Sequence, residues 1–227
     1  MEFCDCISYK GKENMQEMLL LLKRYGFAGA IVLVKDDIFD EKIFESMIPP
    51  REFKVFSGIE IFADSLSNLK KKVYKFRRRG DLLAVHGGND RIDRMASREK
   101  EINLVRHTEG GHGIDHITAR FAAENGVAMD FCLTALIYSR TSMPAILGKM
   151  RRNLMLMRKY KTPMILSTGG ENKFDLRPPR QMTALSELFG MTREESLRSL
   201  KMPLEIVDKN RRYKEGRLIR DGVEIVR

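Results

Sequence analysis

Short apolar, β-branched runs alternate with segments of helical period along most of the chain. Seven such runs predict strands, at residues 3–8, 29–35, 54–62, 82–86, 103–107, 127–132 and 164–168. Strands that alternate with helices are typical of parallel βα units. Because seven units follow one another without a break in composition, the pattern favours an α/β, TIM-barrel-like (βα) barrel over an open, doubly wound sheet. Periodicity alone leaves the closure of the sheet open.

The segments between the strands carry the apolar stripe of helices packed on a sheet. From Met15 to Leu22, for example, apolar residues recur at i, i+3, i+4 and i+7. Helices are predicted at residues 13–25, 65–80, 114–125 and 142–160, and three consecutive helices at 180–189, 192–200 and 203–213. Residues 1–213 are therefore expected to form a single barrel domain with additional C-terminal helices. Residues 214–227, which include the turn pair Asp221-Gly222, are expected to form a tail or a small hairpin.

Length and composition narrow the class of protein. The chain has 227 residues, of which 43% are hydrophobic and 32% charged, and this excludes an intrinsically disordered chain. The uncharged stretches, such as residues 131–139, are too short to cross a bilayer, and the N-terminus lacks a signal-peptide pattern. The three cysteines form no disulfide framework, and Cys4 and Cys6 are interpreted as buried packing residues. A cytoplasmic protein without membrane contact is expected.

The positive charge is concentrated in the second half of the chain. The net charge of +10 divides into +1 for residues 1–115 and +9 for residues 116–227. Residues 140–180 alone hold ten basic side chains against two acidic ones. Such a localised excess favours a polyanionic partner. A single run such as Arg77-Arg78-Arg79 is instead interpreted as an ordinary solvated helix face.

Several arginines coincide with loops at the predicted strand ends. Arg91 and Arg94 follow the fourth strand, and Arg177 and Arg180 flank a di-proline turn after the seventh. The planar guanidinium suits phosphate oxygens, although salt bridges to Asp175 or Asp93 are a competing explanation. A weaker second patch lies on the helix at residues 142–160. The full set of predicted RNA-binding residues is Arg91, Arg94, Arg106, His107, His112, Lys149, Arg151, Arg152, Arg177 and Arg180.

All four histidines fall at a strand end or in the loop after the fifth strand, where barrels place their active sites. Their spacing matches no compact metal-ligand signature. The histidines are therefore interpreted as loop residues or RNA contacts rather than as metal ligands. Neither glycine-rich segment, 86–90 or 167–172, matches a phosphate-binding loop or a dinucleotide fingerprint. No catalytic residues are predicted.

Several segments in matching order carry a resemblance to a known family. They are residues 87–94 (GGNDRIDR), 113–116 (GIDH), 119–125 (ARFAAEN), 167–170 (STGG), 175–180 (DLRPPR) and 188–191 (LFGM). With these motifs the chain resembles the component 3 (p30-type) protein subunit of archaeal ribonuclease P. The resemblance extends from residue 3 to about residue 213.

The resemblance implies a TIM-barrel-like fold related to the polymerase and histidinol phosphatase (PHP) superfamily. It also implies a non-catalytic, RNA-binding subunit of a ribonucleoprotein that removes the 5′ leader from precursor tRNA. The partners would be the ribonuclease P RNA, which performs the cleavage, a small α/β protein subunit and the other holoenzyme proteins. Magnesium would serve the RNA, and this chain would bind no cofactor.

Two alternatives stay open. PHP metalloenzymes begin with a His-x-His pair on the first strand, where this chain has Cys4-Asp5-Cys6, so the resemblance implies that the metal centre is lost. A PHP-like metal-dependent phosphoesterase would have to use His86, His107, His112 and Asp130. The third possibility is a barrel that acts as a protein scaffold, with its basic face against an acidic partner.

Overall fold

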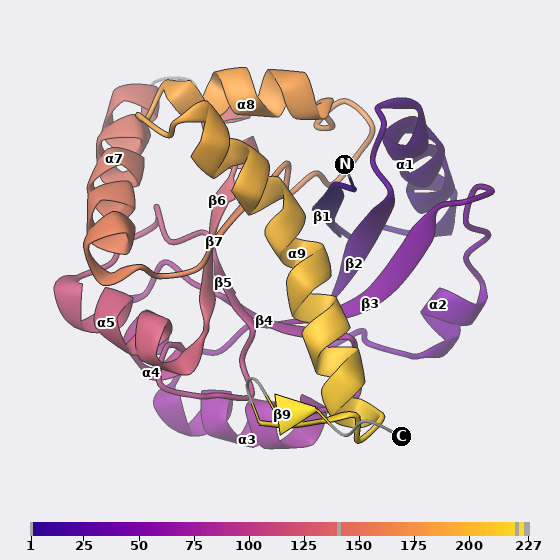
Figure 1. The fold of residues 1–227 in the computed structure, drawn as a ribbon, viewed down its shortest axis with the longest axis horizontal. Coiled ribbons are helices and arrows are strands. Elements are labelled where there is room, and N and C mark those ends of the chain that lie inside the picture. Colours follow the sequence, from indigo (N-terminus) through magenta and orange to yellow (C-terminus); the bar gives the residue numbers. More distant parts are fainter. Residues whose placement is uncertain (1, 140–141, 221–222, 225–227) are drawn as a thin grey trace.

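Seven parallel strands form the centre of the molecule, and each pairs with the next one along the chain (Figure 1). The computed structural model describes residues 2–139, 142–220 and 223–224. The strands are β1 Cys4–Ser8, β2 Gly29–Lys35, β3 Lys54–Ile61, β4 Leu82–His86, β5 Leu104–Arg106, β6 Ala128–Cys132 and β7 Met164–Ser167. All seven predicted strands are confirmed.

The two edge strands, β1 and β7, meet through the loop that follows β7. The amide of Ser8 donates to the carbonyl of Gly170 over 2.9 Å, and the amide of Gly169 donates to the carbonyl of Cys6 over 3.2 Å. In addition, the Asp5 carboxylate accepts a 2.8 Å hydrogen bond from the amide of Thr168. Within the described residues no eighth strand joins the sheet. The sheet is therefore a nearly closed, TIM-barrel-like α/β barrel, as predicted.

Helices surround the sheet and bury their apolar stripes against it (Figure 1). They are α1 Lys12–Arg24, α2 Lys42–Glu45, α3 Leu66–Phe76, α4 Asp90–Ala96, α5 His116–Asn125, α6 Thr134–Ile137, α7 Met143–Tyr160 and α8 Pro179–Glu187. The stripe predicted between Met15 and Leu22 is buried in α1. Three short helices, α2, α4 and α6, were not predicted, because they have four, seven and four residues and show no full apolar period.

The last helix, α9 Arg193–Lys214, corrects the prediction of separate helices at 192–200 and 203–213. It is one helix of 22 residues with Pro203 inside it. A proline removes one backbone hydrogen bond and normally ends a helix. Here the apolar side of α9, which includes Leu200, Pro203 and Val207, is buried against the barrel, and that burial outweighs the local cost.

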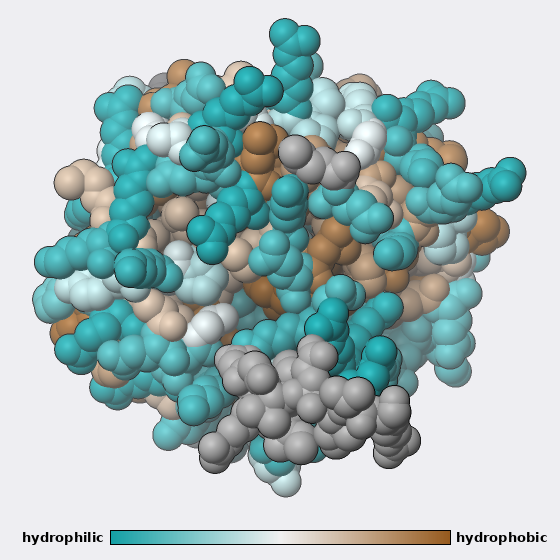
Figure 2. Space-filling model, viewed as in Figure 1, coloured by the Kyte–Doolittle hydropathy of each residue, from teal (hydrophilic) through white to brown (hydrophobic). Residues whose placement is uncertain are grey.

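α9 runs diagonally across the barrel and covers the end at which the strands begin (Figure 1). Val207 packs on the residues that fill the barrel interior, such as Ile31 and Leu104. The side-chain amide nitrogen (Nδ2) of Asn210 donates to the backbone carbonyl of Asp81, just before β4, over 2.8 Å. Viewed from this side, the surface is mainly hydrophilic with apolar patches near its centre (Figure 2). The opposite end of the barrel, at which the strands finish, is called the mouth below.

Two further expectations concern the cysteines and the tail. Cys4, Cys6 and Cys132 are free and buried, and for Cys4 and Cys6 this confirms the interpretation as buried packing residues. Strands β8 Leu218–Arg220 and β9 Val223–Glu224 pair antiparallel, whereas residues 221–222 and 225–227 lie outside the described part of the chain. The division of domains at residue 213 stays a prediction. None of the helices in the described part of the chain is both long and apolar enough to span a bilayer.

Candidate nucleic-acid interface

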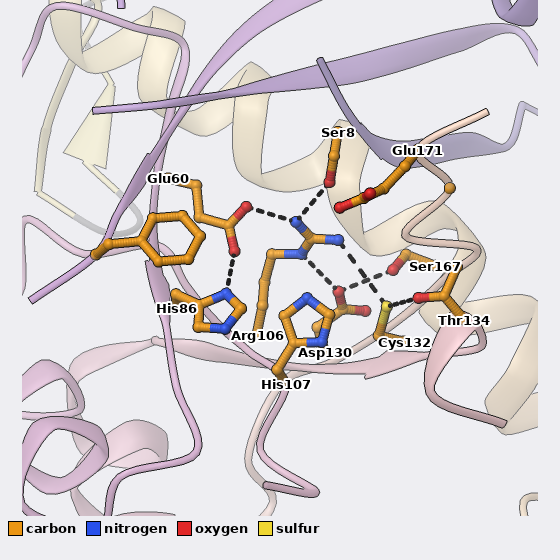
Figure 3. Close-up of polar contacts among 12 residues, drawn as sticks. Ser8, Glu60, His86, Arg106, His107, Asp130, Cys132, Thr134, Ser167 and Glu171 are labelled. Carbon is orange, nitrogen blue, oxygen red and sulfur yellow. Dashed lines mark hydrogen bonds and ion pairs between the residues drawn. The ribbon is translucent and has the colours of Figure 1, made fainter. Parts of the chain in front are cut away.

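A buried arginine lies inside the barrel close to its mouth. Arg106, on β5, has no exposed surface. Its Nη1 is 2.8 Å from Oε2 of Glu60 on β3, and its Nε is 3.2 Å from Oδ2 of Asp130 on β6 (Figure 3). Nη1 also donates to the hydroxyl of Ser8 over 3.3 Å. The guanidinium thus connects β5 with three other strands of the barrel, β1, β3 and β6.

The charges around Arg106 are set by burial and by the guanidinium together. Burial alone would raise the pKa of Glu60, but Arg106 and His86 outweigh it and lower this pKa to about 2. For Asp130, burial dominates and the pKa is raised, although Arg106 and Ser167 oppose it. Asp130 keeps one carboxylate oxygen, Oδ1, without a hydrogen-bond partner. Arg106 is therefore the cation that allows Glu60 to stay ionised inside the barrel.

The burial of Arg106 corrects one of the predicted RNA contacts. The sequence places Arg106 in that set, whereas the structure buries it completely and pairs it with protein acceptors. An RNA phosphate has no access to the guanidinium in this arrangement. The reason is visible only in three dimensions, because Glu60 and Asp130 are 46 and 24 residues away in the sequence.

Two histidines form a partly exposed aromatic stack at the mouth. His86 stacks on Phe62 with ring centroids 4.3 Å apart, and the ring of His107 lies 4.6 Å from that of His86. Nδ1 of His86 is 2.9 Å from Glu60 (Figure 3). Nδ1 of His107 is 3.4 Å from Glu109. His107 also has a φ of 55°, a backbone conformation that is uncommon for residues other than glycine.

The same histidines provide the one group among the described residues that could hold a metal ion. The possible ligand atoms of Glu60, His86 and His107 lie within 4.8 Å of one another. Nitrogen and oxygen ligands of this kind suit zinc. However, Glu60 is already bonded to both Arg106 and His86, and the adjacent guanidinium repels a second cation.

The four residues named for a metal-dependent phosphoesterase do not come together. His86 and His107 are neighbours, but the side chain of His112 is 91% exposed and 3.2 Å from Asp90 on the outer surface. Asp130 is held by Arg106 and Ser167 inside the barrel. The fourth histidine, His116, is exposed at the start of α5. The structure therefore assembles two of the four proposed ligands and adds Glu60, which the sequence pattern did not single out.

Glycines bring two loops of the mouth into direct contact. Gly88 lies in the loop after β4 and Gly110 in the loop after β5, and a Cβ atom on Gly110 would be only 2.8 Å from Cα of Gly88. Gly88 also has a φ of +91°, which favours glycine. Because no side chain separates the loops, the start of α4, the 107–113 loop and α7 form a continuous surface.

Four predicted RNA-binding residues lie on this surface, which we call the mouth basic surface. It consists of Arg91, His112, Lys149 and Arg152. Nζ of Lys149 donates to the carbonyl of Gly111 over 2.7 Å, so this side chain is fixed against the loop. Nη2 of Arg152 lies 2.7 Å from the position a Cβ atom would take on Gly113. Arg91 is exposed in the first turn of α4.

The competing salt bridges do not form as the sequence suggested. The Asp93 carboxylate accepts a hydrogen bond from the amide of Gly88, and burial raises its pKa to about 7. Asp175 accepts hydrogen bonds from the amides of Glu171 and Asn172. Both aspartates therefore stabilise loop backbone rather than pair with the arginines. The exception is Arg94, which pairs with Asp115.

The remaining basic residues form a second group along α8. Arg177 folds back on its own loop, where Nη1 donates to the carbonyls of Phe174 and Leu176 over 2.7 and 2.8 Å. Arg151 donates to the carbonyl of Leu188 at the end of α8, and Arg180 is exposed in the first turn of that helix. The four arginines predicted at strand ends thus lie at one end of the barrel, in two groups: Arg91 and Arg94 follow β4, and Arg177 and Arg180 follow β7.

Comparisons with known proteins point to one family. A family model described as RNase P subunit p30 matches residues 2–215. The ribonuclease P protein component 3 of Methanococcoides burtonii is 36% identical over 219 residues, which cover 95% of this chain and 89% of the relative. A cryo-EM structure of archaeal ribonuclease P with mature tRNA contains a chain that is 27% identical, with a TM-score of 0.84, and the match covers 99% of this chain and 98% of that one.

More distant similarities concern the fold alone. A crystal structure of a Xaa-Pro dipeptidase with bound methionine matches with a TM-score of 0.63 at 10% identity, and the match covers 92% of this chain and 76% of that one. At this level of identity the similarity supports the barrel architecture and says nothing about chemistry.

Proposed function

The chain belongs to the ribonuclease P subunit p30 family, and from this premise we propose that it binds the RNA of the holoenzyme and supports RNA-catalysed removal of the 5′ leader from precursor tRNA. The observation that carries the proposal is the mouth basic surface, where contact between Gly88 and Gly110 gathers Arg91, Lys149 and Arg152. Fixed cations suit phosphate groups, because little side-chain entropy is lost on binding.

The barrel interior supports a non-catalytic role for this chain. Arg106 engages the two buried carboxylates, Glu60 and Asp130, that a hydrolytic barrel would need free for a metal ion or a proton transfer. We propose that magnesium acts on the RNA, that this chain holds no cofactor, and that it works in the cytoplasm. The proposed partners are the ribonuclease P RNA, a small α/β protein subunit and the other holoenzyme proteins.

The test of this function is reconstitution of cleavage with and without the chain across a magnesium titration. Folding an RNA concentrates phosphate charge, and a bound positive surface offsets repulsion that magnesium would otherwise neutralise. We expect omission of the chain to raise the magnesium concentration needed for half-maximal cleavage. Production of the mature 5′ end by the chain alone, without the RNA subunit, would contradict the proposal.

The mouth basic surface is tested by a triple variant, Arg91→Gln, Lys149→Gln and Arg152→Gln. We expect weaker RNA binding and a slope of log affinity against log salt that is smaller by about 2 to 3. The matched control removes the same charge from exposed positions elsewhere, with Lys12→Gln, Arg51→Gln and Arg193→Gln. Equal effects of both triple variants would show that net charge, rather than this surface, determines binding.

The metal-dependent phosphoesterase remains a second candidate because of one observation, the proximity of Glu60, His86 and His107. Elemental analysis of the purified chain distinguishes the two functions. We expect no stoichiometric transition metal. A tightly held ion that is lost in a His86→Ala variant would favour the hydrolase.

A further inference from the structure

The segment that contains helix α3 has an excess of positive charge that nearby acidic residues neutralise only in part. Residues 65–80 contain seven lysines and arginines and no acidic residue. This segment lies in the half of the chain whose net charge is only +1, so the imbalance is hidden in the overall composition. The mouth basic surface does not include it.

Two of the seven cations are neutralised and hold α3 on the barrel. Nζ of Lys72 is 2.7 Å from the carboxylate of Asp36, and the Arg79 guanidinium is 3.0 Å from that of Glu41. The other five form no ion pair with any described residue, and they are exposed. We call these five the α3 basic face: Lys70, Lys71, Lys75, Arg77 and Arg78.

The helix geometry places the three lysines on the side of α3 that faces away from the barrel. Lys70, Lys71, Tyr74 and Lys75 lie at positions i, i+1, i+4 and i+5, and this spacing puts them on the outer side of the helix. The inner side is buried and consists of Leu69, Val73 and Phe76. The three lysines and Tyr74 thus share one side of the helix, and Arg77 and Arg78 follow where the helix ends at Phe76.

An exposed aromatic side chain lies within the face. Tyr74 is 71% exposed, and the guanidinium carbon of Arg77 lies 4.4 Å from the centre of its ring. The tyrosine therefore holds a planar cation in place at the surface. Arginine that is stacked on an aromatic ring can bind phosphate oxygens along its edge, and the tyrosine can stack with an unpaired base.

The arrangement costs helix stability unless a polyanion is bound. Lys71 and Lys75 are like charges at i, i+4, a spacing that destabilises a helix. An ordinary solvated helix face mixes the two signs, as in α5, where Arg120 and Glu124 pair at the same spacing. Phosphate groups along an RNA strand would relieve the repulsion and supply the missing negative charge.

We propose that the α3 basic face is a second contact for the RNA backbone of the holoenzyme, separate from the mouth basic surface. The proposal rests on the proposed RNA-binding function. The cations of Arg77 and Arg78 follow the last turn of α3, just before Gly80, whose carbonyl accepts a hydrogen bond from Lys214 of α9. Because α9 covers the end of the barrel opposite the mouth, an RNA that touches both surfaces follows the side of the barrel (Figure 1).

The experiment compares two triple variants in the reconstituted holoenzyme. The first, with Lys70→Gln, Lys71→Gln and Lys75→Gln, removes three of the five cations of the α3 basic face. The second, with Lys12→Gln, Lys42→Gln and Lys159→Gln, removes the same charge from exposed positions elsewhere. Binding of the ribonuclease P RNA is measured as a function of salt, together with hydroxyl-radical protection of that RNA. A third variant, with Lys70→Arg, Lys71→Arg and Lys75→Arg, keeps the charge.

The expected result is that the α3 variant lowers the salt slope by about 2 to 3 and exposes RNA positions different from those exposed by the mouth variant. The control and arginine variants should behave like the unchanged chain. An unchanged slope and unchanged protection in the α3 variant alone would overturn this inference and leave the proposed function intact. If the mouth variant also has no effect, the proposed RNA contact fails as well. Loss of another holoenzyme protein at unchanged RNA protection would identify a protein interface instead and also overturn the inference.

Discussion

The barrel interior and the α3 basic face place positive charge in opposite environments. Arg106 is fully buried and contacts two carboxylates, whereas Lys70, Lys71 and Lys75 are exposed and form no ion pair with a described residue. A buried cation depends on its protein partners, because desolvation would otherwise expel it. An exposed, unpaired cation is available to a partner from outside. The charge of a residue therefore does not indicate its role until its neighbours are known.

The largest expected effect comes from removing the buried cation. Arg106→Met leaves Glu60 and Asp130 buried without their counter-charge, and we expect the free energy of unfolding to fall by about 3–5 kcal/mol. Denaturant unfolding measures this. Arg158→Met, which breaks the exposed pair with Glu195, serves as the control and should cost about 1 kcal/mol or less. Similar losses in both variants would remove the distinction between buried and exposed cations.

A second prediction separates two buried carboxyl groups by their dependence on pH. The pKa of Glu60, about 2, lies below its usual 4.5, so its contribution to stability is present above pH 4.5 and is lost as the pH falls towards 2. Burial raises the pKa of Asp5 from 3.8 to about 7. The folded state therefore keeps a proton that the unfolded state releases, and stability falls as the pH rises from about 4 to 7.

These opposite trends are tested with Glu60→Gln and Asp5→Asn. Asp5→Asn should make the decline between pH 4 and 7 shallower, a change on the order of 4 kcal/mol at most, while Asp93, whose pKa is also raised to about 7, maintains part of it. Glu60→Gln should reduce the loss of stability below pH 4.5, and Glu195, whose pKa is also lowered to about 2, should maintain part of that loss. Both are read from the free energy of unfolding at intervals between pH 2 and 8. If Asp5→Asn keeps the slope of the unchanged chain, the carboxyl group is not the source of the decline.

The smallest effect is expected on the α3 basic face. Neutralising Lys70, Lys71 and Lys75 with glutamine should leave the free energy of unfolding unchanged or raise it by about 0.5 kcal/mol at low salt, because repulsion is relieved. The difference should vanish in about 0.5 M salt. A loss of more than about 1 kcal/mol at low salt would mean that these lysines stabilise the fold, and the contrast with Arg106 would disappear.

The sequence predicts the barrel well because its signals are local. The seven strands and α1 follow from periodicity within each segment, and each lies where the pattern places it. The same local reasoning fails at Pro203, because the burial of α9 against the barrel is a long-range effect that no window around the proline contains. It also fails at the short helices α2, α4 and α6.

The candidate interface shows the same limit at individual residues. Arg91 and Arg152 lie at the surface, as expected of residues that contact RNA, whereas Arg106 does not. Arg77 and Arg78, in the run interpreted as a solvated helix face, are exposed, but they follow the end of α3 at Phe76 rather than lie within the helix. Arg106 lies at the end of β5, next to a loop, and its position in the sequence does not indicate that its side chain points into the barrel.

The sequence by itself determined the order of strands and helices, the family and the excess of positive charge, because each is carried by residue types and local spacing. Only the tertiary structure decided which cations form buried ion pairs and which are exposed without one, because Arg106 contacts Glu60 and Asp130 only once the barrel has formed. Ion pairing depends on distance in space and on the loss of water, and neither is encoded in the spacing of residues along the chain.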